Sequence, residues 1–128
     1  MSTICVDFDG TCVEHAYPEI GELVPHAVRV LQKFKEDGHT LILYTMRSGI
    51  GLALAISFMG EQGVVFDHVN ANPSQKDWTN SQKVYADWYI DDAAAGCPLT
   101  SYPGANRAYV DWLRIEEMYH RKWCNDGG

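Results

Sequence analysis

Residues 4–11 read Ile-Cys-Val-Asp-Phe-Asp-Gly-Thr, an apolar run that ends in two aspartates, a glycine and a threonine. A continuous apolar run of this kind is typical of a strand that is buried on both faces, as in a parallel sheet. Asp7 and Asp9 stand two residues apart, so their side chains leave an extended backbone on the same side. Two like charges this close repel each other, and a hard divalent cation such as Mg²⁺ relieves the repulsion by taking carboxylate oxygens as ligands. The stretch therefore predicts a buried strand that delivers carboxylates to a metal site.

Segments typical of strands and of helices alternate along the rest of the chain. Apolar and β-branched runs predict further strands at 40–45, 64–66 and 88–90, with an edge strand at 98–100. Apolar residues at helical spacing predict helices over 24–37, 52–62 and 108–119, a helical turn at 81–86, and a polar loop over 70–80. Such alternation implies a parallel sheet covered by helices on both sides. We therefore expect one α/β domain over residues 1–128, with a Rossmann-like, three-layer sheet.

Length, charge and cysteine content exclude several classes of protein. The chain has 128 residues, which suits one domain, and its formal net charge of −7 disfavours binding to long nucleic acids. Its N-terminus has no basic region before an apolar run, and the sequence contains no stretch long and apolar enough to span a membrane. None of its four cysteines forms a Cys-x-x-Cys pair, which fits reduced thiols. We expect a cytoplasmic protein that does not bind membranes.

Polar side chains follow three of the predicted strands. Asp7 and Asp9 follow the first strand, Thr45 ends the second, and Asp91 and Asp92 follow the strand at 88–90. Ligands of open α/β sheets bind beyond the carboxyl ends of the strands, so these side chains are expected to converge. Taken singly, these residues have structural explanations: Asp9 can form a turn with the glycine that follows it, and Asp91 and Asp92 can cap a helix. The recurrence of such residues at three strand ends favours a site.

In this order, these residues resemble the four motifs of the haloacid dehalogenase (HAD) superfamily of phosphotransferases. The first motif, Asp-x-Asp-x-Thr, is matched by residues 7–11, and the second, a Thr or Ser at the end of the next strand, by Thr45. The third is a lysine, for which Lys83 is the better match and Lys76 the rival. The fourth is an acidic pair after a strand, matched by Asp91-Asp92, and the resemblance covers residues 4–92.

The resemblance implies a Mg²⁺-dependent phosphomonoester hydrolase. Asp7 would be the nucleophile and form an aspartyl-phosphate. Asp9 would protonate the leaving alcohol and then activate water, while its backbone carbonyl would bind the metal. Thr45 would hydrogen-bond the transferring phosphoryl oxygens, and Lys83 would add positive charge.

Other residues are expected to complete the site. Asp7, Asp9, Asp91 and Asp92 would form the metal set; the resemblance favours Asp92 as the direct ligand, and the choice between Asp91 and Asp92 stays open. Substrate contacts are expected from Gly10 and Thr11 in the first motif and from two residues near the rim, Arg47 and Asn72. Arg47 would hold a second anionic group, with a surface charge as its alternative role. The alternative for Asn72 is turn formation.

The spacing leaves no room for the cap domain that many HAD proteins carry. Residues 12–24 alone separate the first motif from the first predicted helix, and a helix and a strand occupy most of the segment between Thr45 and Lys83. The resemblance then implies an open site, used either for a bulky substrate or under a lid from a partner subunit, which leaves a homodimer open. Alternatively, residues 14–21 form a small flap.

Two other functions compete with a general phosphatase. A receiver-like signalling domain also uses Asp, Thr, Lys and Mg²⁺ on a parallel sheet, without turnover. In receivers, however, the acidic pair follows the first strand and the acceptor aspartate follows the third, an order that this chain does not show. Within the phosphatases, a nucleotidase or a polynucleotide end-phosphatase is the alternative. The acidic net charge favours a small phosphorylated substrate.

Overall fold

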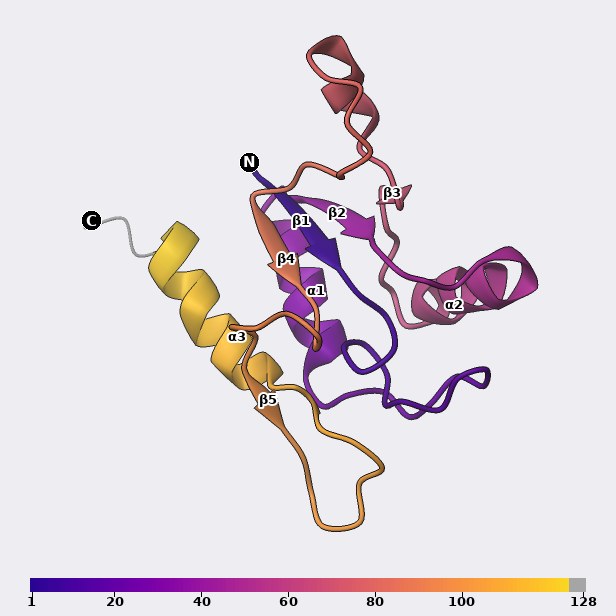
Figure 1. The fold of residues 1–128 in the computed structure, drawn as a ribbon. Coiled ribbons are helices and arrows are strands. Elements are labelled where there is room, and N and C mark those ends of the chain that lie inside the picture. Colours follow the sequence, from indigo (N-terminus) through magenta and orange to yellow (C-terminus); the bar gives the residue numbers. More distant parts are fainter. Residues whose placement is uncertain (125–128) are drawn as a thin grey trace.

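Four parallel strands form the central sheet, in the order β3-β2-β1-β4 (Figure 1). The computed structural model describes residues 1–124. The strands are β1 (Thr3–Val6), β2 (Thr40–Leu43), β3 (His68–Val69) and β4 (Trp88–Ile90). Val6 at the end of β1 pairs with Leu43 of β2 and with Ile90 of β4. The three strands therefore end at one level, and the residues that follow them emerge side by side.

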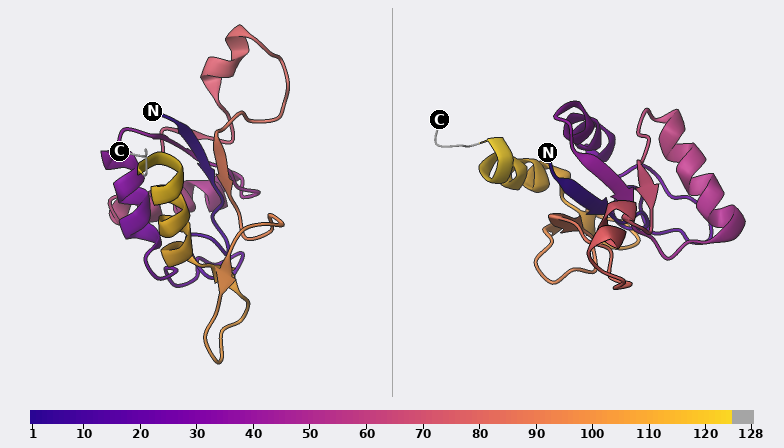
Figure 2. Two further views of the ribbon diagram at one scale, coloured as in Figure 1. Left: turned by 90° about the vertical axis from the view of Figure 1, so that its left-hand side faces the viewer. Right: turned by 90° about the horizontal axis from the view of Figure 1, so that it is seen from above.

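Helices cover one face of this sheet. They are α1 (Ala27–Glu36), α2 (Gly49–Glu61) and α3 (Trp112–Tyr119), which continues into η2 (His120–Cys124). Figure 2 shows α1 and α3 lying together along the sheet, and the two helices contact each other. Side chains from every second strand position, such as Ile4 and Val6, join residues from all three helices in the main core.

The opposite face has a thinner cover. Cys5 and Ile42 point to it and pack against Val84 and Ala86 in a small second core. These two covering residues belong to segment 70–87, which also contains the 3₁₀ helix η1 (Pro73–Asp77) and extends away from the sheet at the top of Figure 1. The expected α/β fold, a Rossmann-like parallel sheet flanked by helices, is thus confirmed. None of the helices within residues 1–124 has the length and apolar character needed to cross a membrane.

A two-stranded antiparallel ribbon follows the sheet, formed by β5 (Leu99–Thr100) and β6 (Tyr109–Val110). It braces the loop after β1, because the Val110 N–H donates to the Gly10 carbonyl at 3.0 Å. At the start of α3, the buried indole N–H of Trp112 donates to the Thr11 carbonyl at 2.7 Å. The C-terminal part of the chain therefore fixes the backbone of the first motif.

Several predicted elements lie elsewhere in the structure. The apolar residues 64–66 do not form a strand; pairing begins at His68, because Asp67 accepts from the Leu41 N–H at 2.8 Å and anchors the chain at that point. The strand predicted at 98–100 joins β6 rather than the sheet edge. Residues 81–86 are not helical, and the helical turn occurs instead at η1, where the Asn72 side chain caps the backbone and Pro73 takes the first position.

Candidate active site

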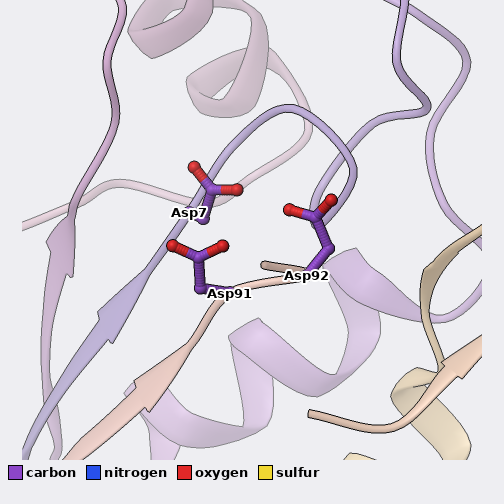
Figure 3. Close-up of side chains that lie close together, drawn as sticks. All are labelled: Asp7, Asp91 and Asp92. Atoms are coloured by element: carbon purple, nitrogen blue, oxygen red, sulfur yellow. The ribbon is translucent and has the colours of Figure 1, made fainter. Parts of the chain in front are cut away.

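Three aspartates meet at the carboxyl ends of the neighbouring strands β1 and β4 (Figure 3). Asp7 follows β1, Asp91 and Asp92 follow β4, and each contributes a carboxylate oxygen to a group whose atoms all lie within 4.8 Å of one another. The Asp7 N–H donates to the Ile90 carbonyl at 2.9 Å, which continues the strand pairing up to the site. All three side chains are half-buried. The predicted convergence of the first and fourth motifs is therefore present.

The cluster concentrates negative charge in a poorly solvated place. Burial raises the pKa of Asp7 to about 8, with further contributions from the neighbouring Asp92 and Asp91. Three hard oxygen donors in this arrangement fit a divalent cation such as Mg²⁺, which would relieve their mutual repulsion. Asp7, Asp91 and Asp92 are the residues that could hold it.

Thr11 ties two of these aspartates together. Its side chain is completely buried. The hydroxyl donates to Asp7 Oδ2 at 3.3 Å and accepts from the Asp92 N–H at 3.2 Å. Thr11 was expected to contact substrate; because it is buried and uses its hydroxyl in this way, it positions the two carboxylates instead.

Gly10 makes room for the cluster. Its φ of +84° lies in the region that favours glycine, and a Cβ there would lie 2.5 Å from Asp92 Oδ2 and collide with His15 Nε2. A side chain at this position would therefore push apart the groups that build the site. The structure gives Gly10 this steric role, while the substrate contact expected of it stays a prediction.

His15 is a site residue that the sequence pattern does not single out, because it belongs to none of the four motifs. Its Nε2 lies 2.8 Å from Asp92 Oδ2, and the Asn106 side chain donates to the His15 carbonyl at 3.1 Å. The one available signal was its place in the short loop that follows the first motif.

The Asp9 carboxylate is not part of the group formed by Asp7, Asp91 and Asp92. It forms a two-pronged ion pair with Arg47, with Nε 2.8 Å from Oδ2 and Nη2 2.8 Å from Oδ1. The Asp9 side chain was expected in the metal set, and this orientation corrects that prediction for the carboxylate. The metal contact expected from its backbone carbonyl stays a prediction.

Arg47 also has a different role from the one expected. Its side chain is 2% exposed, and it donates to the carbonyls of Pro18 and Glu19 at 3.2 and 2.7 Å. The guanidinium lies 5.1 Å from the ring centroids of both Phe8 and Tyr17. Arg47 therefore joins Asp9 to the predicted flap at 14–21 instead of facing a second anionic group of the substrate.

Thr45 and Asn72 differ in their surroundings. Thr45 lies after β2, where its Oγ1 accepts from the Arg47 N–H at 3.1 Å and its backbone pairs with the Asn70 side chain. The Asn72 side chain is engaged within its own loop, accepting from Ser74 and donating to the Tyr85 carbonyl at 2.9 Å. Asn72 thus organises segment 70–87, and the substrate contact expected of it is replaced by this structural role.

Of the two candidate lysines, Lys83 is placed better. Its ammonium lies 6.0 Å from the ring centroid of Tyr89. Tyr89 and Asp7 line the same cavity, of about 200 Å³. Lys76 belongs to η1 and lines a different cavity, within segment 70–84. Lys83 thus lies next to a residue of the Asp7 cavity and Lys76 does not, while the choice of Lys83 as the lysine of the third motif stays a prediction.

No protein-family model and no curated protein sequence matches the chain. A solved structure of a conserved protein from Bacteroides thetaiotaomicron superposes with a TM-score of 0.77 and 38% sequence identity. The match covers 94% of this chain and 91% of the Bacteroides chain.

Proposed function

The chain belongs to the same family as this conserved Bacteroides thetaiotaomicron protein, and we propose that it is a Mg²⁺-dependent phosphomonoester hydrolase of the HAD superfamily that forms an aspartyl-phosphate on Asp7. One observation carries the proposal. The central strand β1 ends at Asp7, and carboxylate oxygens of Asp91 and Asp92 lie within 4.8 Å of an Asp7 oxygen. A structural role alone does not account for three carboxylates placed at such a cost in desolvation and repulsion.

The proposed reaction has two displacements at phosphorus. An Asp7 carboxylate oxygen attacks phosphorus, the ester P–O bond breaks, and the departing alkoxide takes a proton from Asp9. Water then attacks the phosphorus of the aspartyl-phosphate and gives its proton to Asp9, which releases phosphate and restores Asp7. When bound, Mg²⁺ would supply positive charge that neutralises the phosphoryl group as the anionic nucleophile approaches.

Asp9 must change its partner to carry out its part. Both of its carboxylate oxygens accept from Arg47, so a proton on either oxygen requires the loss of a hydrogen bond. We infer that at least one Asp9 oxygen gives up its hydrogen bond with Arg47 when substrate binds. Thr45 and Lys83 are proposed to contact the phosphoryl oxygens, because Thr45 follows β2 at the same sheet edge and Lys83 lies above Tyr89.

The strand order supports this proposal over a receiver-like signalling domain. Flavodoxin-like sheets, the type that receivers have, place the first strand between the second and the third. Here β1 lies between β2 and β4, with β3 at the edge. The substrate is proposed to be a small phosphorylated molecule. A cytoplasmic location is part of the proposal and fits the free thiols of Cys5, Cys12 and Cys97.

Hydrolysis assays on a panel of phosphomonoesters test the proposed function. The panel includes an aryl phosphate, sugar phosphates and 5′- and 3′-nucleotides, each with Mg²⁺ and with EDTA. We expect turnover that needs Mg²⁺ and that Asp7→Asn abolishes. The matched variant Asp77→Asn, at an exposed position of η1, should leave turnover intact. A stable phosphoryl-protein formed from acetyl phosphate without turnover would overturn the hydrolase in favour of the signalling function.

A further inference from the structure

We propose that the cavity beside Asp7 binds an aromatic ring, so that the substrate is a small aromatic phosphomonoester. The inference rests on the proposed function and names its substrate class. The cavity has a volume of about 200 Å³, with Asp7 and Asp91 at one end and Cys5, Tyr44, Tyr89 and Ile90 among its walls. The nucleophile and the apolar walls therefore belong to one continuous space.

The sheet itself explains why this space is open. Side chains alternate along a strand, so Tyr44 and Tyr89 face the same side as Cys5 and Ile42, away from the main core. The cover on that side consists of Val84 and Ala86, which pack on Cys5 and Ile42. The end of the sheet face next to Asp7 is left to the two tyrosines.

The tyrosine rings form a preorganised wall. Their centroids are 6.5 Å apart with an interplanar angle of 49°, and Tyr44 and Tyr89 are 38% and 37% exposed. The Tyr89 hydroxyl donates to the Val84 carbonyl at 2.6 Å and accepts from the Ala86 N–H at 3.0 Å. These bonds fix the Tyr89 ring before any ligand binds, which lowers the entropic cost of stacking.

The size of the cavity and the charge beside it restrict the class of ligand that can bind. An apolar protein cavity of about 150 Å³ admits benzene, so the space here accepts one six-membered ring and has little room for a whole nucleoside. Aromatic rings gain from tilted or offset contact with other rings beyond the burial of apolar area. Lys83, with its ammonium 6.0 Å from the centroid of the Tyr89 ring, places positive charge beside one wall of the cavity.

Three esters of primary alcohols test the inference: benzyl, cyclohexylmethyl and propyl phosphate. Their leaving groups have similar basicity, so differences in kcat/KM report on recognition of the organic group. We expect the protein to prefer benzyl phosphate to propyl phosphate by about tenfold, and to cyclohexylmethyl phosphate by about threefold. Tyr44→Leu should lower the benzyl-to-propyl ratio by about threefold to tenfold, and Tyr44→Phe should restore it. The control Tyr85→Leu, whose parent ring packs against Trp78 instead, should leave all three rates unchanged.

A benzyl-to-propyl ratio near one, or a ratio that Tyr44→Leu does not change, overturns the aromatic site and leaves the hydrolase standing. Calorimetric binding of benzylphosphonate and propylphosphonate with Mg²⁺ separates the two proposals. Tighter binding of benzylphosphonate that Tyr44→Leu removes, without turnover of any ester, supports the aromatic site and overturns the hydrolase. Equal binding of the two phosphonates overturns the aromatic site whatever the activity.

Discussion

Arg47 holds both carboxylate oxygens of Asp9 in a partly buried ion pair, with each N–O distance at 2.8 Å. The two residues lie 38 positions apart in the chain and meet beside the candidate active site. The hydrogen bond to Asp9 raises the pKa of the Arg47 guanidinium above its ordinary value, so Arg47 stays charged at neutral pH. The pair thus joins the first motif to the flap carbonyls of Pro18 and Glu19.

Loss of this arginine should destabilise the protein. In Arg47→Met, the Asp9 carboxylate and two flap carbonyls lose their partner, and we expect the free energy of unfolding to fall by about 2–4 kcal/mol. Urea denaturation measures the change. The double variant Arg47→Met/Asp9→Asn should recover part of the loss, because the unpaired charge is gone. An unchanged denaturation midpoint in Arg47→Met would show that the pair contributes nothing to stability.

The raised pKa of Asp7 predicts how stability depends on pH. In the unfolded chain Asp7 titrates near 3.8, whereas burial and then Asp92 and Asp91 raise its folded pKa to about 8. Between these values the folded state keeps a proton that the unfolded state releases, so metal-free stability should fall as pH rises from 4 to 8. Asp7→Asn should therefore stabilise the protein at pH 8, by about 1–3 kcal/mol, and hardly at pH 4.

Thermal unfolding in EDTA at the two pH values checks this expectation. The control Asp77→Asn, at an exposed position on η1, should unfold like the wild-type protein at both. Equal effects of Asp7→Asn at pH 4 and pH 8 would show that Asp7 titrates normally in the folded protein. Addition of Mg²⁺ at pH 8 should raise the melting temperature of the wild-type protein, because the cation takes the place of the proton.

The parts of the site that the sequence predicted are those fixed by local pattern. The continuous apolar runs of β1 and β4 place Asp7 and Asp91 at adjacent strand ends, because parallel pairing brings the carboxyl ends of both strands to one edge. The same logic placed Thr45 at the end of the second strand, which in the structure ends two residues earlier, at Leu43. The strand at 88–90 was predicted with its observed bounds.

The parts that the sequence did not predict depend on contacts between distant segments. The Asp9 carboxylate could bind either a metal ion or Arg47, and a single sequence contains no information on which of the two lies closer. His15 reaches Asp92 across 77 positions, and its loop is held by Asn106 from the ribbon. The start of β3 depends on Asp67, which accepts from the Leu41 N–H and pairs with Lys35; the apolar pattern at 64–66 does not contain this signal.

Thr11 should matter for metal affinity although it is remote from solvent. Thr11→Val keeps the shape of the side chain but removes the hydroxyl that bridges Asp7 and the Asp92 backbone. We expect the Mg²⁺ concentration for half-maximal activity to rise by about tenfold or more. The exposed Thr100 of β5 offers the matched control Thr100→Val, which should leave the metal requirement unchanged. If both variants reach half-maximal activity at the same Mg²⁺ concentration as the wild-type protein, the Thr11 hydroxyl does not position the carboxylates.

The role of Asp9 as proton donor can be separated from its role in the ion pair by changing the leaving group. Asp9→Asn keeps an oxygen that can accept from Arg47 but cannot deliver a proton to the departing alkoxide. The variant should lower the rate of hydrolysis of benzyl phosphate, whose alkoxide is a poor leaving group, by about 100-fold or more. It should lower the rate for phenyl phosphate by less, because phenoxide departs more readily. The rate of alcohol or phenol release in a single turnover, with enzyme in excess over the ester, measures the first displacement alone. Equal losses with the two esters would assign Asp9 to the ion pair with Arg47 and not to proton transfer.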